Sequence, residues 1–155
     1  MLPLELSLFE EVADVVRWLV PRELGEIHHR PRRWGIKSWF GPEAPTKEHY
    51  EAQVIGPDGV ADAEILALEI GFHAEHRREA DNDAVLAHLA GAEHRWRPAV
   101  GTEAVVGPFL GGPEGWRRIS ETWPDPDLGA ADLAFEIGTR LTDYLTALEP
   151  VRRTR

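Results

Sequence analysis

Histidine and glutamate residues gather in and just after a predicted strand, where their types suit acid–base or metal chemistry. The stretch contains Glu69, His73, Glu75 and His76. Imidazole and carboxylate groups together can ligate zinc or manganese, or they can transfer protons as an acid–base pair. The order His-x-Glu-His matches neither of the zinc-protease patterns His-Glu-x-x-His and His-x-x-Glu-His.

The spacing of these residues limits what they can do together. Along a regular strand, at about 3.3 Å per residue, Glu69 and His73 would lie about 13 Å apart. His73 and His76 would point to opposite faces of a strand and would be neighbours only on a helix. One interpretation is a small metal-dependent hydrolase with His73, Glu75 and His76 as metal ligands. The other, which the spacing favours, is a solvated strand edge that leads into an acid-rich helix start.

A second cluster combines arginine and tryptophan side chains. Guanidinium groups bind anions through paired hydrogen bonds, and tryptophan offers a flat surface for stacking. Residues 22–37 hold five basic and two acidic side chains. The cluster predicts a binding surface for an acidic or aromatic peptide or protein, unless the arginines pair with the protein's own carboxylates. Its residues are Arg30, Arg32, Arg33, Trp34 and Trp39.

Composition excludes several classes of function. The 155 residues include 27 acidic and 17 basic side chains, for a net charge of −10, which disfavours general binding to nucleic acids or anionic membranes. No cysteine is present, so disulfides, thiol nucleophiles and Cys-ligated zinc are excluded. The first residues lack the basic and apolar regions of a signal peptide, and we expect a cytoplasmic protein.

Other catalytic patterns are missing. The glycine-rich residues 107–115 contain Pro113, which has no N–H for a phosphate, and no Lys-Ser/Thr follows them. Ser38 and Ser120 lie outside the Gly-x-Ser-x-Gly pattern of serine hydrolases. The sequence therefore predicts no catalytic residue and no cofactor for its favoured interpretation.

Three helices are predicted from apolar residues at helical spacing. The first has a capping-box pattern at Ser7 and Glu10, and the others follow capping residues at positions 81–83 and at Asp127. We expect the three helices to end at Pro21, Pro98 and Pro150.

Five strands complete the pattern, and one hairpin has two possible registers. A direct turn sets Glu51 opposite Glu64, which is unfavourable because like charges then face each other. A bulge at Gly59, which we favour, sets Tyr50 opposite Leu66. The predicted strands lie within residues 25–41, 49–55, 66–73, 102–110 and 116–123.

The element order is α-β-β-β-α-β-β-α over residues 1–150, followed by a basic tail at 151–155. It predicts a single α+β domain with an antiparallel sheet and helices on one face. The order is similar to that of the type III secretion chaperone-like fold, which implies a chaperone-like role. A run of residues also resembles an uncharacterised domain appended to some restriction-type nucleases, and neither resemblance transfers a functional residue. That run includes Glu64, Asn82, Leu86, Leu89, Trp116 and Ile119.

The function we expect is therefore a non-enzymatic module that binds a protein or peptide. The polarity of charge along the chain favours self-association as a homodimer, or an oppositely charged protein partner, over nucleic acid. A small metal-dependent hydrolase built on residues 69–76 is the alternative.

Overall fold

The computed structural model describes the backbone of residues 2–155 and the side chains of residues 8–155. The helices are α1 (Leu2–Leu19), the short 3-10 helix η1 (Arg22–Leu24), α2 (Glu79–Ala90), α3 (Glu93–Val100) and α4 (Leu133–Arg152). The strands are β1 (Ile27–Arg32), β2 (Gly35–Phe40), β3 (Glu48–Ile55), β4 (Ala67–Ala74), β5 (Val105–Pro108) and β6 (Arg117–Pro124).

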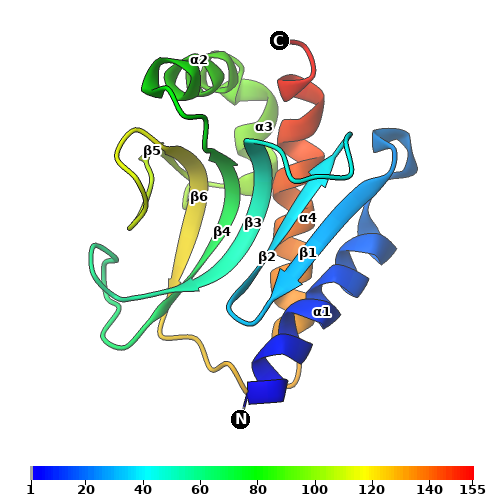
Figure 1. Ribbon diagram of the computed structural model, residues 1–155, viewed down its shortest axis with the longest axis vertical. Helices are drawn as coiled ribbons and strands as arrows, with labels where there is room; N and C mark the ends of the chain where they lie inside the picture. Colours follow the sequence, from blue (N-terminus) through cyan, green and yellow to red (C-terminus); the bar gives the residue numbers. More distant parts are fainter. Residues whose placement is uncertain (1) are drawn as a thin grey trace.

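The six strands form one antiparallel sheet in the order β1-β2-β3-β4-β6-β5. Helices α1 and α4 pack against one face of this sheet, and strands β3, β4 and β6 curve strongly (Figure 1). Alternate residues of β4, among them Leu68, Ile70 and Phe72, are buried in the core beneath the helices. The predicted α+β fold with an antiparallel sheet is confirmed. None of the described helices is long and apolar enough to cross a membrane.

The segment 25–41, predicted as one interrupted strand, is a hairpin. Strand β1 pairs with β2 up to Arg32 opposite Gly35, so the turn falls at Arg33 and Trp34. Pro31 lies in β1, which is an edge strand, where a residue without an N–H is tolerated. The prediction missed the turn because it has none of the glycine, asparagine or aspartate residues typical of tight hairpins.

The β3–β4 hairpin has a register that neither prediction gave. Tyr50 lies opposite Phe72, six positions beyond Leu66 along the chain. The reason is a side-chain cap, because Asp125 accepts hydrogen bonds from three consecutive backbone N–H groups before Ala67 and keeps them out of the sheet. The donors are Glu64 at 2.9 Å, Ile65 at 2.7 Å and Leu66 at 3.1 Å.

The helix boundaries also differ from the sequence predictions. Helix α1 already begins at Leu2, and the side chain of Ser7, the expected cap, lies outside the described residues. The expected second helix is divided at Gly91 into α2 and α3, and Pro98 lies inside α3 instead of ending it. Helix α4 starts at Leu133, six residues after Asp127, since a turn lies between them.

Helix α4 passes through Pro150 and extends into the predicted tail. Its last turn is held by Glu149, which is fully buried and accepts hydrogen bonds from Arg152 at 2.8 Å and Arg153 at 2.9 Å. Tyr50 of β3 is the third residue that donates to it, at 2.9 Å. Burial opposes the charge on Glu149, yet these donors lower the pKa of its carboxyl below the ordinary value.

Replacing Glu149 by Gln is expected to destabilise the protein by about 3 kcal/mol at pH 7, because two guanidinium groups lose a buried partner. The carboxyl has a lowered pKa in the folded state, so its contribution is complete above the unfolded pKa of about 4.3 and is lost as pH falls through the folded value. The difference between wild type and variant should therefore shrink in acid. Urea unfolding at several pH values measures it. The exposed Glu136→Gln on the same helix serves as control, and an equal loss in both variants would contradict the assignment.

Candidate functional site

Two histidines and two glutamates meet on the sheet face opposite α1 and α4. His49 and Glu51 are two positions apart on β3, so both point to this face, and the same holds for His73 and Glu75 at the end of β4. His49 lies directly opposite His73 in the register. All four side chains are buried. We call these four residues the His–Glu cluster.

Four atoms of the cluster form a ring in which nitrogen and oxygen alternate. His49 Nε2 is 3.0 Å from Glu51 Oε1 and 3.2 Å from Glu75 Oε2. His73 Nδ1 is 3.1 Å and 3.3 Å from the same two oxygens. The four side chains offer ligand atoms that all lie within 4.8 Å of one another. Such convergence of imidazoles and carboxylates is typical of a metal site.

The remaining nitrogen of each histidine has its own partner outside the ring. His49 Nδ1 is 3.0 Å from the carbonyl oxygen of Thr46, which can only accept, so this nitrogen carries the proton. His73 Nε2 is 2.7 Å from Glu69 Oε2. Phe109 packs edge-on against the His73 ring, with centroids 4.5 Å apart. These contacts fix the orientation of both rings and direct the other nitrogens toward the ring centre.

Two cationic side chains contact the carboxylates of the cluster. Arg32 donates from Nη2 to Glu51 Oε2 at 3.0 Å. Lys37 Nζ lies 3.7 Å from Glu75 Oε1. Both cations come from the β1–β2 hairpin, so this hairpin orients the carboxylates from one side of the cluster.

The charged forms of the histidines and glutamates in the cluster stabilise one another. Burial opposes a charge on His73, but Glu69, Glu51 and Glu75 raise its pKa well above the ordinary value. Burial likewise opposes a charge on His49, and Glu51 and Glu75 raise its pKa. The histidines lower the pKa of Glu75 to about 2, and that of Glu51 also falls, in both cases against the effect of burial. The carboxylates thus create a buried site that favours positive charge.

The predicted separation of about 13 Å between Glu69 and His73 is wrong for the ends of their side chains. Their side chains are hydrogen-bonded even though both belong to one strand. Gly71, with a φ of 155° and no side chain, lies between them in sequence on β4, which is a curved strand (Figure 1). Glu69 also accepts a hydrogen bond from Gln53 at 2.8 Å. The rise of a regular strand therefore overestimates the distance between these side-chain ends.

Of the three predicted metal ligands, His73 and Glu75 belong to the cluster and His76 does not. His76 Nε2 is 2.6 Å from Glu48 Oε2, and its backbone N–H donates to Asn82. The side chain therefore stands outside the ring, as expected for a residue an odd number of positions from His73 on extended backbone.

The predicted arginine–tryptophan cluster is spread over the β1–β2 hairpin. Arg32 reaches the His–Glu cluster, and the Arg33 guanidinium lies 5.1 Å from the centre of the Trp34 ring. Trp34 is 44% exposed. Trp39 is only 3% exposed, so it offers little surface to a partner, whereas Arg30 is exposed.

Sequence reasoning missed His49 and Glu51. The signal was present as a repeated tripeptide, because His49-Tyr50-Glu51 and His73-Ala74-Glu75 have the same His-x-Glu pattern. In two strands of one hairpin, a repeated i, i+2 pair places four side chains on one face. Finding them required the correct register of β3 and β4. The pattern of apolar residues does not reveal that register, because it depends on the cap at Asp125.

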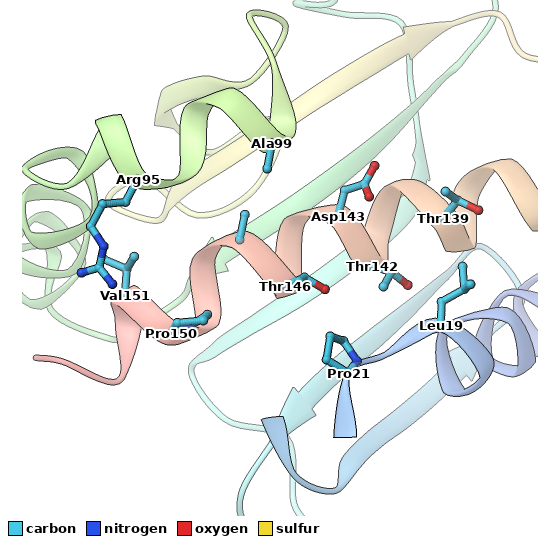
Figure 2. A pocket seen from close by; sticks show the side chains of 11 residues that line it. Leu19, Pro21, Arg95, Ala99, Thr139, Thr142, Asp143, Thr146, Pro150 and Val151 are labelled. Atoms are coloured by element: carbon cyan, nitrogen blue, oxygen red, sulfur yellow. The ribbon is translucent and has the colours of Figure 1, made fainter. Parts of the chain in front are cut away.

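A separate groove of about 560 Å³ lies on the outer side of α4, between the end of α1 and helix α3 (Figure 2). Among its lining residues only Arg95 and Asp143 carry charge, and no histidine is present. It has no converging donor set, so the His–Glu cluster is the better candidate. The lining residues are Leu19, Pro21, Arg95, Ala99, Thr139, Thr142, Asp143, Thr146, Ala147, Pro150 and Val151.

Comparison of the chain with models of protein families, with curated proteins and with solved structures finds no match. The site must therefore be interpreted from its own geometry.

Replacing Gly71 by Ala is expected to destabilise the protein by about 2–3 kcal/mol, since overpacking forces the backbone to shift. A Cβ there would overlap the Ile119 carbonyl oxygen and lie 2.6 Å from Ser120 Cα. Gly56→Ala is the control, because nothing lies within 4 Å of its added Cβ, and its effect should stay within about 0.5 kcal/mol. Urea unfolding compares the two variants, and equal stability would contradict the close packing at Gly71.

Proposed function

We propose that this chain binds one divalent transition-metal ion, with Zn²⁺ the first candidate, in the His–Glu cluster. The observation that carries the proposal is the ring of alternating nitrogen and oxygen atoms, whose neighbours are 3.0–3.3 Å apart. A square with edges of this length has its centre about 2.2 Å from each corner, close to the length of a zinc bond to imidazole or carboxylate. Two histidines and two glutamates are a donor set that zinc accepts.

Hydrogen bonds alone satisfy this ring poorly. His49 directs one nitrogen, and hence at most one proton, at two carboxylate oxygens, and His73 does the same. A proton can align well with only one of the two oxygens, so two of the four close N···O pairs lack a well-aligned hydrogen bond. A cation at the centre would contact all four atoms.

The electrostatics of the cluster support the same assignment. The surrounding carboxylates raise the pKa of both His49 and His73, so the site favours two positive charges. A divalent cation bound by two neutral imidazoles supplies the same charge as two imidazolium groups. The outer hydrogen bonds to Thr46 and Glu69 are those that orient metal-bound histidines in known sites.

Metal-dependent hydrolysis is the second candidate function, favoured by two nearby cavities. One is lined by Phe109, which packs against His73, and the other by Arg32, which donates to Glu51. For this function, zinc would be held by three of the four cluster residues, and a water in the fourth position would have a lowered pKa and act on a carbonyl or phosphoryl group. The metal ligands predicted from the sequence for this hydrolase are His73, Glu75 and His76. In the form proposed here, His49 and Glu51 take the place of His76. Glu69 would act as a positioning residue that orients His73.

Protein or peptide binding by a cytoplasmic homodimer stays a prediction. The exposed Trp34 and the neighbouring Arg33 support it, because both offer surface at the tip of the β1–β2 hairpin. It does not exclude the metal centre, since the hairpin tip and the His–Glu cluster use different atoms.

Metal binding is tested on purified protein that is stripped with a chelator and titrated with Zn²⁺ by calorimetry. We expect one Zn²⁺ per chain, and His49→Ala should weaken binding at least about tenfold, because loss of a ligand costs no less than loss of an outer partner. His76→Ala is the matched control, since this histidine lies outside the ring, and it should bind like wild type.

Two further measurements keep the test valid if His49→Ala does not fold. Glu51→Gln keeps the side-chain shape, and Co²⁺ in the wild-type protein should show the intense visible bands of a four-coordinate site. Substoichiometric Zn²⁺ in the wild type, or equal affinity in His49→Ala and His76→Ala, would overturn the proposal.

A further inference from the structure

Two cavities share Gln53, which follows Glu51 by two positions on β3, as a lining residue. One, of about 370 Å³, is lined by Gln53, Phe109 and Leu110 together with the β3–β4 turn. The other, of about 260 Å³, is lined by Gln53, Arg32 and Arg33 together with Trp34 and its neighbours. Gln53 is hydrogen-bonded to Glu69, which in turn holds His73. The side chain that lines both cavities is therefore linked through Glu69 to His73 of the cluster.

The two cavities differ in charge. The arginine side has two guanidinium groups, and Arg32 is 49% exposed although it also contacts Glu51. The other side has the apolar surfaces of Phe109 and Leu110 and one carboxylate, Asp58. An anionic group is attracted to the arginines and repelled by Asp58, so the charges favour one orientation for a bound ligand.

We propose that these cavities form one binding site for a small organic anion, with its charged group at Arg32 and Arg33 and its aromatic or alkyl body against Phe109 and Leu110. None of the four cluster residues lines either cavity, so this inference goes beyond the proposed metal centre and does not require it. The combined size suits a small metabolite, because ligand cavities typically measure about 300–1,000 Å³. Guanidinium groups form paired hydrogen bonds with both carboxylates and phosphates, so the feature that the site recognises is an oxyanion.

Calorimetric titration with phenylphosphonate, a non-hydrolysable aromatic anion, tests the site in chelator-treated and in Zn²⁺-loaded protein. Benzyl alcohol supplies the ring without the charge, and inorganic phosphate supplies the charge without the ring. We expect phenylphosphonate to bind more tightly than either. Arg33→Gln should weaken it about tenfold or more, the loss of one charged hydrogen bond, and should leave Zn²⁺ affinity unchanged.

Two variants separate the parts of the site. Leu110→Ala should weaken phenylphosphonate and leave phosphate unaffected. Arg95→Gln, an arginine in the groove on the outer side of α4, is the control and should bind as wild type does.

The outcomes distinguish the two proposals. Phenylphosphonate that binds no better than benzyl alcohol, or equally well to Arg33→Gln, would overturn the anion site whatever the protein does with Zn²⁺. Binding of phenylphosphonate that depends on Arg33 in a protein that takes up no Zn²⁺ would uphold the anion site and contradict the metal centre.

Discussion

His49 and His73 lie opposite each other on two antiparallel strands, and two positions after each histidine a glutamate points to the same face. All four side chains are buried. Charged groups removed from water are stable only when they are paired and hydrogen-bonded. Each imidazole here lies between carboxylates, and each carboxylate lies between imidazoles. Removing one member would leave the others with an uncompensated charge, so the geometry of this face depends on all four at once.

The two faces of β3 connect this group to the rest of the fold. Tyr50 points toward the helices and donates to Glu149 of α4, while His49 and Glu51 point away from them. The carboxylate of Glu149 also holds the two arginines of the last helical turn. The position of β3 is therefore fixed from the helix side by a buried polar contact.

How far the sequence predicts this molecule depends on the kind of signal. Apolar periodicity gives the α+β class, the antiparallel sheet and the approximate places of the elements, because burial on one face leaves a regular pattern. It cannot give the β3–β4 register, since that depends on Asp125, a distant residue that caps three backbone groups. His73 and Glu75 were identified from their residue types, whereas their partners His49 and Glu51 become visible only when the register is known. The contact between Glu69 and His73 depends on Gly71 and on strand curvature, which no linear spacing rule contains.

X-ray absorption at the zinc edge of the Zn²⁺-loaded protein tests the central claim most directly, because it reports the atoms around the metal. The account predicts four nitrogen or oxygen ligands at about 2.0–2.1 Å, with the outer-shell scattering of two imidazole rings. In Glu69→Gln the same shell should persist with weaker affinity, since Glu69 only orients His73. A six-oxygen shell without imidazole scattering, or zinc that is washed away by dialysis, would contradict a metal centre at His49, Glu51, His73 and Glu75.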